Sequence, residues 1–165
     1  MSEGGRHPAA GTPGAFPEIE RTLISRERIS QRVHELATRL CDDLRAQKGG
    51  VESAAGQVVM VPIMSGAMIF ASDLVREMPL KLGLGLVAVS SYPGKSLASK
   101  GAVIQSELPA DLAGKHVVIV DDILDSGQTI ELVRKIIGEQ KPASIRACVL
   151  LRKDVPRTAT TPDEQ

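Results

Sequence analysis

Three carboxylates and a short hydroxyl-bearing turn stand close together in the sequence, between residues 121 and 129. Asp121 and Asp122 directly follow the apolar run 117–120 (VVIV), and Asp125 comes three residues later. The segment 126–129 (SGQT) then opens a predicted helix, and hydroxyls and free N–H groups at a helix start can hold a phosphate. Carboxylates accept hydrogen bonds from ribose hydroxyls and also bind Mg²⁺. The pattern therefore predicts a sugar-phosphate site.

The alternative for this segment is an acidic surface loop that binds nothing. Three acids at the end of an apolar strand repel one another unless a ligand or a cation offsets their charge. The clustering of Asp121, Asp122 and Asp125 therefore favours a binding site over a plain loop.

Strands and helices that alternate along the chain must position these residues. Apolar runs predict strands at 58–63, 82–91, 103–106, 117–120 and 145–151. Helical periodicity predicts three helices, one between Ser25 and Gly49–Gly50, one over about 68–78 and one from near Gln128. Such alternation is typical of an α/β fold with an open, mainly parallel sheet flanked by helices, in which ligands bind beyond the carboxyl ends of the strands.

Composition excludes several classes of function. The chain has 165 residues and equal numbers of basic and acidic side chains, 20 each, so no nucleic-acid partner is expected. Aromatic residues make up only 2% of it, which argues against base-stacking surfaces. Its two cysteines, Cys41 and Cys148, suit a reducing compartment. Without a long apolar run or a secretory leader, we expect a cytoplasmic protein with no membrane association.

One domain is expected from this length. Residues 1–17 are rich in glycine, proline and alanine and predict a disordered tail. Residues 18–157 form the predicted domain, and residues 158–165 (TATTPDEQ) form a polar C-terminal tail.

The segment 117–129 (VVIVDDILDSGQT) closely resembles the diphosphoribosyl-binding motif of type I phosphoribosyltransferases. Asp125 makes it most similar to the hypoxanthine-guanine branch. The predicted first helix, the turn 64–67 (MSGA), the pair Ser91–Tyr92 and the segment 151–157 (LRKDVPR) also resemble that branch, so that the likeness spans about residues 22–157. It implies a Rossmann-like phosphoribosyltransferase fold.

The resemblance implies an enzyme of purine salvage. It would transfer the 5-phosphoribosyl group of phosphoribosyl pyrophosphate (PRPP) to hypoxanthine or guanine, with Mg²⁺, and give IMP or GMP and pyrophosphate. The resemblance also implies a homo-oligomer, either a dimer or a tetramer. A non-catalytic PRPP- or nucleotide-binding or regulatory module derived from such an enzyme is the alternative. The choice among hypoxanthine, guanine and xanthine stays open.

Each matched residue receives a role by the same resemblance. Asp121 and Asp122 would bind the ribose hydroxyls and place Mg²⁺, while Asp125 would act as general base near the purine N7. Lys153 would donate to the 6-oxo oxygen. The 5′-phosphate would be bound by Ser126, Gly127, Gln128 and Thr129. Pyrophosphate would be bound by Ser65 and Gly66, and Ser91 and Tyr92 would close over the transition state.

Two departures from the family pattern stand out. Many members of the family have lysine or arginine where this chain has Ser65. After the segment 151–157, the family continues with a strand, an aromatic that stacks on the purine and a further acid. Residues 158–165 contain neither an aromatic nor an apolar run, so the chain is expected to end short of these purine-hood strands.

Overall fold

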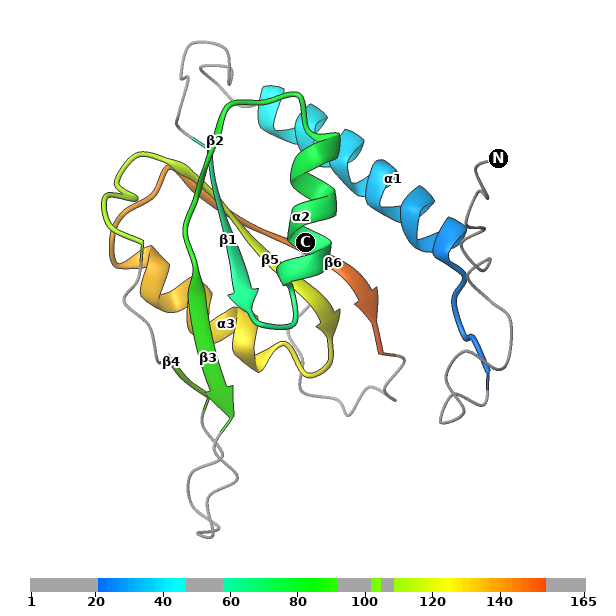
Figure 1. Cartoon of the computed structure of the whole chain (residues 1–165). Coiled ribbons are helices and arrows are strands. Elements are labelled where there is room, and N and C mark those ends of the chain that lie inside the picture. Colours follow the sequence, from blue (N-terminus) through cyan, green and yellow to red (C-terminus); the bar gives the residue numbers. More distant parts are fainter. Residues whose placement is uncertain (1–20, 47–57, 92–101, 105–108, 154–165) are drawn as a thin grey trace, which may run out of the picture.

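Helices and strands alternate through the part of the chain that the structure, a computed structural model, describes: residues 21–46, 58–91, 102–104 and 109–153. The expected tails, 1–17 and 158–165, and Tyr92 lie outside these residues. The elements are α1 (Arg26–Arg45), β1 (Val58–Met64), α2 (Met68–Glu77), β2 (Leu82–Leu84), β3 (Val87–Ser91), β4 (Ala102–Ile104), β5 (His116–Leu124), α3 (Gln128–Gly138) and β6 (Ser144–Arg152) (Figure 1).

The sheet is open and mainly parallel, which confirms the predicted α/β class. Its strand order is β4-β3-β1-β5-β6, and β2 also pairs with β1. The pairs of β1 with β2, β3 and β5, and of β5 with β6, are parallel, whereas β4 runs antiparallel to β3. The carboxyl ends of β1, β3, β5 and β6 therefore meet at one edge of the sheet, as Figure 1 shows by their arrowheads.

Helices cover both faces of the sheet. Val58 and Met60 of β1 pack into a core with α1 and α2, whereas Val59, Val61 and Ile63 pack into a second core with α3. Because successive side chains of a strand point to opposite faces, a continuous apolar strand supplies both cores. The result is three layers, with α1 and α2 on one side and α3 on the other (Figure 1).

The first helix begins as the sequence predicts. Ser25 lies just before it, and its side-chain oxygen accepts a hydrogen bond from the backbone N–H of Arg28 at 3.3 Å. This bond satisfies one of the N–H groups that have no partner within the helix. The helix ends at Arg45, before Gly49 and Gly50, which lie outside the described residues.

The predicted strand 82–91 is interrupted and forms β2 and β3 instead. The register against β1 is the same on both sides of the gap, since Met60 pairs with Leu84 and Ile63 with Val87. The N–H of Gly85 donates to the carbonyl of Met60 at 2.8 Å. Pro62, two residues further along β1, faces the same neighbouring strand as Met60, but a proline has no N–H to donate to it. The ladder is therefore broken opposite Pro62.

Gly85 also has no room for a side chain. A Cβ at this position would lie 2.2 Å from Cγ of Pro109. We expect Gly85→Ala to lower the free energy of unfolding by about 1–3 kcal/mol, because a contact this short forces the backbone or the proline ring to move. Denaturant unfolding would measure the change. Gly83→Ala is the matched control, since its nearest contact would be 3.6 Å, and an equal loss in both variants would contradict this explanation.

The fourth predicted strand is longer than expected. The apolar run 117–120 was predicted to end at Asp121, but β5 continues to Leu124. β6 continues beside it, pairing Asp121 with Val149 and Leu124 with Arg152, whereas β1 pairs with β5 only as far as Val120. Hydrogen bonds to one neighbour therefore carry the strand past its apolar part. The third predicted strand, 103–106, corresponds to β4, and residues 105–108 lie outside the described part.

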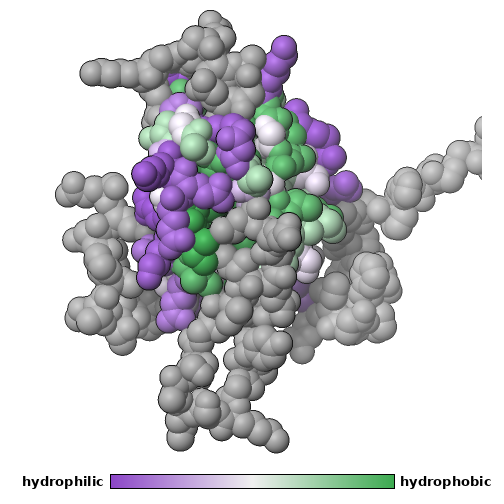
Figure 2. Space-filling model, turned by 90° about the vertical axis from the view of Figure 1, so that its left-hand side faces the viewer, coloured by the Kyte–Doolittle hydropathy of each residue, from purple (hydrophilic) through white to green (hydrophobic). Residues whose placement is uncertain are grey.

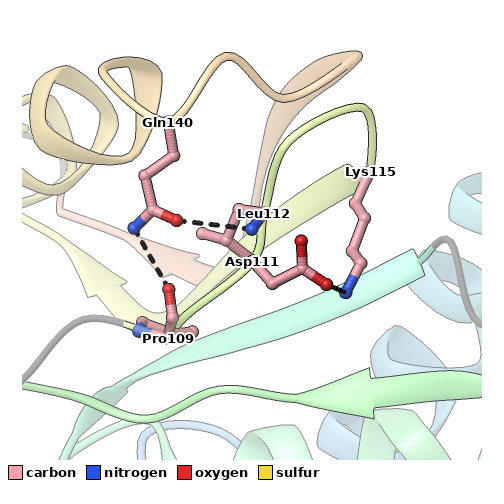
Figure 3. A network of polar contacts seen from close by, with 5 residues as sticks. All are labelled: Pro109, Asp111, Leu112, Lys115 and Gln140. Carbon is pink, nitrogen blue, oxygen red and sulfur yellow. Dashed lines mark hydrogen bonds and ion pairs between the residues drawn. The ribbon is translucent and has the colours of Figure 1, made fainter.

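A network of polar contacts ties α3 to the segment that leads into β5 (Figure 3). The amide of Gln140 donates to the carbonyl of Pro109 at 3.1 Å and accepts from the N–H of Leu112 at 3.3 Å. Asp111 pairs with Lys115 nearby at 3.1 Å. The two hydrogen bonds of Gln140 hold the segment before β5 against the turn after α3, at the edge of the sheet away from the acidic segment.

Across the described residues, we find no helix with the length and apolar character needed to cross a membrane.

Candidate active site

Four segments of the predicted site come together where the parallel strands end. β1 ends at Met64, β5 at Leu124 and β6 at Arg152, and the residues that follow each strand lie at the same edge of the sheet. Figure 1 shows the N-terminus of α3 at this edge as well. The connection between β5 and α3 therefore brings the acidic segment and the helix start together.

Asp121 and Asp122 stand on the last part of β5, where β1 no longer pairs with it. Both side chains are partly buried. Burial raises the pKa of Asp121 from its ordinary 3.8 to about 6, the neighbouring Asp122 charge also raises it, and a hydrogen bond from the backbone N–H of Asp122 partly offsets the rise. Keeping this carboxylate ionised costs free energy in the protein without ligand. A bound cation or a hydroxyl group that donates a hydrogen bond would reduce that cost.

The turn between β1 and α2 lies against Asp122. A Cβ on Gly66 would stand 3.0 Å from both carboxylate oxygens of Asp122. The absence of a side chain at Gly66 therefore allows the carboxylate to lie directly beside the turn backbone. Ser65 and Gly66 are exposed, and the peptide bond between Met64 and Ser65 is cis.

The start of α3 offers backbone N–H groups to a ligand. Gly127 precedes the helix with a φ of 79°, a conformation that favours glycine, and no side chain caps the helix there. The first N–H groups of a helix have no intrahelical acceptor, and together with the helix dipole they suit an anion. Ser126 and Gln128 beside them are exposed and Thr129 is partly buried.

Asp125 and Lys153 form an ion pair that the sequence did not reveal. Lys153 Nζ lies 2.6 Å from Asp125 Oδ2, and its backbone N–H donates to the carbonyl of Leu124 at 2.9 Å. The two side chains are 57% and 58% exposed, so the pair contributes at most about 1 kcal/mol to stability. The signal that could have found it is topological, because both residues directly follow neighbouring parallel strands.

The remaining predicted residues are less fully described. Ser91 is the last residue of β3 and pairs with Ala102 of β4. In the sheet, β1 lies between β3 and β5, so Ser91 is separated by one strand from the acidic segment. Tyr92 lies outside the described residues. The structure thus brings together Asp121, Asp122, Asp125, residues 126–129, Gly66 and Lys153, and it leaves the contribution of Ser91 and Tyr92 as a prediction.

The donor atoms at this edge fit a magnesium ion that is shared with a phosphate ligand. No group of three or more histidine, cysteine or acidic side chains with metal-site geometry occurs among the described residues. Mg²⁺ is commonly held by one or two carboxylates together with phosphate oxygens and water. Asp121 and Asp122 supply two carboxylates of that kind beside a helix start that suits phosphate.

Comparisons with known proteins point to one family. Residues 27–163 match the family model of the phosphoribosyl transferase domain. The hypoxanthine-guanine phosphoribosyltransferase of Mycobacterium tuberculosis is 36% identical over 152 residues, which cover 88% of this chain and 73% of the relative. The hypoxanthine phosphoribosyltransferase of Haemophilus influenzae is 33% identical over 86% of this chain and 76% of its own length.

Solved structures agree with these sequence relatives. A hypoxanthine-guanine phosphoribosyltransferase from Bacillus anthracis has a TM-score of 0.70 and 28% identity, covering 87% of this chain and 82% of the other. A hypoxanthine phosphoribosyltransferase from Staphylococcus aureus has a TM-score of 0.73 and 26% identity, covering 88% and 74%.

Proposed function

The chain belongs to the phosphoribosyl transferase family, and from this premise we propose that it transfers the 5-phosphoribosyl group of PRPP to hypoxanthine or guanine. The products are IMP or GMP and pyrophosphate, and the role is purine salvage. The observation that most directly supports this proposal is the position of the Asp125–Lys153 pair, which lies beside Asp121, Asp122 and the N-terminus of α3. Relatives named as enzymes do not favour the non-catalytic alternative.

PRPP is bound by the two carboxylates and by the helix start. Asp121 and Asp122 accept hydrogen bonds from the ribose hydroxyls, while residues 126–129 hold the 5′-phosphate. Ser65 and Gly66 contact the pyrophosphate through their backbone. Uncharged N–H groups at a helix start stabilise an anion by their partial positive charge, which supports this assignment.

The base is recognised by the Asp125–Lys153 pair. The purine N9 forms a bond to C1′ of the ribose as the bond from C1′ to the pyrophosphate oxygen breaks. Asp125 takes a ring proton from the purine near N7, and Lys153 donates to the 6-oxo oxygen. An ammonium group beside a carboxylate offers one donor and one acceptor side by side, which suits a 6-oxopurine better than adenine. Ser91 and Tyr92 would exclude water as the site closes.

Mg²⁺ is proposed as the cofactor, held by Asp121 and Asp122 together with substrate oxygens. When bound, the ion neutralises phosphate charge. The chemical fit of two partly buried carboxylates supports this assignment.

Three coarser proposals complete the description. We propose a domain over residues 18–157, and the family match over 27–163 supports it. A cytoplasmic location is consistent with two buried, free cysteines, Cys41 and Cys148. A homo-oligomer, a dimer or a tetramer, is proposed from the family resemblance, and sedimentation would measure it.

The function is tested by incubating the protein with PRPP, Mg²⁺ and each of hypoxanthine, guanine, xanthine and adenine. We expect IMP or GMP to form and AMP not to form. PRPP binding without any nucleotide product would support the non-catalytic module instead.

Gly66 provides a test of the turn beside Asp122. In Gly66→Ala the new methyl group would displace the Asp122 carboxylate, a side-chain end held by a single hydrogen bond from the N–H of Ile123, so the loss of stability should stay below about 1.5 kcal/mol. The KM for PRPP should rise about two- to tenfold, the range expected when one hydrogen bond is weakened. Gly83→Ala is again the matched control, and an unchanged KM in Gly66→Ala would contradict the proposed contact.

Ser65 provides a test of the pyrophosphate end. Many family members carry a cation at this position, and Ser65 is exposed. Ser65→Lys should lower the KM for PRPP by about two- to fivefold, as expected for one added surface charge pair. Ser65→Gln adds length without charge and should leave the KM unchanged. The same KM shift in both variants would remove charge as the explanation.

A further inference from the structure

The Asp122 carboxylate lies between two parts of the proposed PRPP site. Asp121 and Asp122 of β5 form its ribose subsite, and Ser65 and Gly66, in the turn between β1 and α2, form its pyrophosphate subsite. A Cβ on Gly66 would lie 3.0 Å from both carboxylate oxygens of Asp122. Because β1 and β5 stop pairing just before the turn, this contact joins the two subsites at the point where each strand leaves the sheet.

The backbone of the turn is held more firmly than the carboxylate beside it. Ala67 is fully buried, and its N–H donates to the carbonyl of Ile63 at 3.1 Å. Asp122 Oδ1 accepts a hydrogen bond from the N–H of Ile123 at 2.9 Å, and among the described residues Asp122 forms no ion pair. A ligand can therefore move the carboxylate more easily than it can move the turn.

The two ligand groups act on this carboxylate in opposite ways. Pyrophosphate and the Asp122 carboxylate are both anions, so each raises the free energy of placing the other beside Gly66. Ribose hydroxyls donate hydrogen bonds to the carboxylate, which offsets part of its charge and holds it on the ribose side. A filled ribose subsite therefore reduces the repulsion that pyrophosphate meets at the turn.

We infer, on the premise of the proposed function, that Asp122 couples the ribose and pyrophosphate subsites. Pyrophosphate binds more tightly when a ribose with free 2′- and 3′-hydroxyls is bound, and by thermodynamic linkage it strengthens ribose binding by the same factor. PRPP carries both groups and gains from the coupling, whereas each product loses affinity once the other has left. Asp122 is a positioning residue for pyrophosphate in addition to its contact with the ribose.

The coupling is tested by calorimetric titration of pyrophosphate into protein that is saturated with IMP or with dideoxy-IMP, which lacks both ribose hydroxyls. Mg²⁺ is kept at one concentration, and the Asp125→Asn protein is used as the parent so that the reverse reaction stays slow. The two nucleotides share the base and the 5′-phosphate and differ only in the hydroxyls. We expect pyrophosphate to bind at least about fivefold more tightly with IMP, the lower end of the usual coupling between sites. A ratio near one in the parent would overturn the inference.

Two carboxylate variants separate Asp122 from its neighbour. Asp122→Asn removes the charge beside Gly66 and should bring the ratio of the two affinities close to one. Asp121→Asn makes the same change at a carboxylate that is not among the atoms nearest to a Cβ on Gly66, and it should retain the ratio. An equal loss in both variants would assign the coupling to a shared metal ion or to the ribose contacts alone, and the role of Asp122 would be wrong.

Gly66→Ala tests the contact without a change of charge, because its methyl group displaces the carboxylate. The ratio should fall toward one, and an unchanged ratio would contradict the contact. Gly83→Ala is the control for an added methyl group, since Gly83 pairs with Val59 near the start of β1, at the end of that strand away from the turn. Figure 2 views the side of the molecule that carries β2 and shows apolar surface interleaved with hydrophilic residues there.

Failure of the coupling and failure of the proposed function give different results. If the wild-type protein forms IMP from PRPP and hypoxanthine but the ratio is one, only the coupling is wrong. If it forms no IMP and binds neither pyrophosphate nor IMP, the proposed function is wrong and the coupling with it.

Discussion

Replacing Asp125 with asparagine should lower kcat by about 10²–10⁴, the usual contribution of a positioned general base. Asparagine keeps the size of the side chain but cannot accept the ring proton of the purine. PRPP affinity should stay nearly unchanged, because the ribose and phosphate are held by Asp121, Asp122 and residues 126–129. Steady-state kinetics together with calorimetric titration of PRPP would separate the two quantities.

Lys153→Gln is the control for this prediction. Asp125→Asn also removes the ion pair with Lys153, and the lysine variant removes that pair while keeping the carboxylate. We expect the lysine variant to raise the KM for the base with a much smaller effect on kcat. If Asp125→Asn weakened PRPP binding as much as it slowed turnover, the role of Asp125 as a base would be wrong.

Replacing Asp121 with asparagine should have opposite effects on binding and on stability. PRPP affinity should fall about 10- to 100-fold, because a charged hydrogen-bond acceptor and a proposed metal ligand are lost. The free energy of unfolding at pH 7.5 should rise by about 1 kcal/mol, since a half-buried charge is removed and solvent screening limits the gain.

The stability gain should depend on pH in a defined direction. Burial raises the pKa of Asp121 to about 6 in the folded protein, against 3.8 ordinarily, so the folded state binds the proton more tightly. The wild-type protein therefore loses stability as the pH rises from about 4 through 6, and the asparagine variant does not. The difference between the two should be near zero at pH 4 and complete above pH 7. Urea unfolding at several pH values would measure it.

Glu139→Gln provides the reference for this pH series. Glu139 is an exposed carboxylate at the end of α3. Its replacement makes the same carboxylate-to-amide change at a helix end, and the Asp121→Asn series is compared with it at each pH. A gain in Asp121→Asn that is equally large at pH 4 would show that charge burial is not its cause.

Much of the architecture follows from apolar patterning. The runs 58–63 and 117–120 each became a buried parallel strand, because a strand buried on both faces must be apolar along its length. The run 145–151 also became a parallel strand, β6, although most of its residues are only partly buried. Ser25 began α1 as its capping chemistry predicts. The grouping of Asp121, Asp122 and Asp125 at one sheet edge likewise follows from their position after an apolar strand.

Other features depend on contacts between distant segments. The break between β2 and β3 reflects Pro62 on the neighbouring strand and Pro109 against Gly85, neither of which local periodicity reveals. β5 extends past its apolar residues because β6 continues to pair with it. The Asp125–Lys153 pair joins residues 28 positions apart, and it needs the order of the strands before it can be predicted.

The most direct test of the account compares nucleotide formation by the wild-type protein and by Asp125→Asn, with PRPP, Mg²⁺ and hypoxanthine in excess. We expect the wild-type protein to form many equivalents of IMP and to release pyrophosphate in equal amount. We expect the variant to bind PRPP with nearly the same affinity and to form IMP at least about a hundredfold more slowly. Absence of IMP above background in the wild-type sample, with PRPP binding retained, would contradict the assignment of this chain as an active phosphoribosyltransferase.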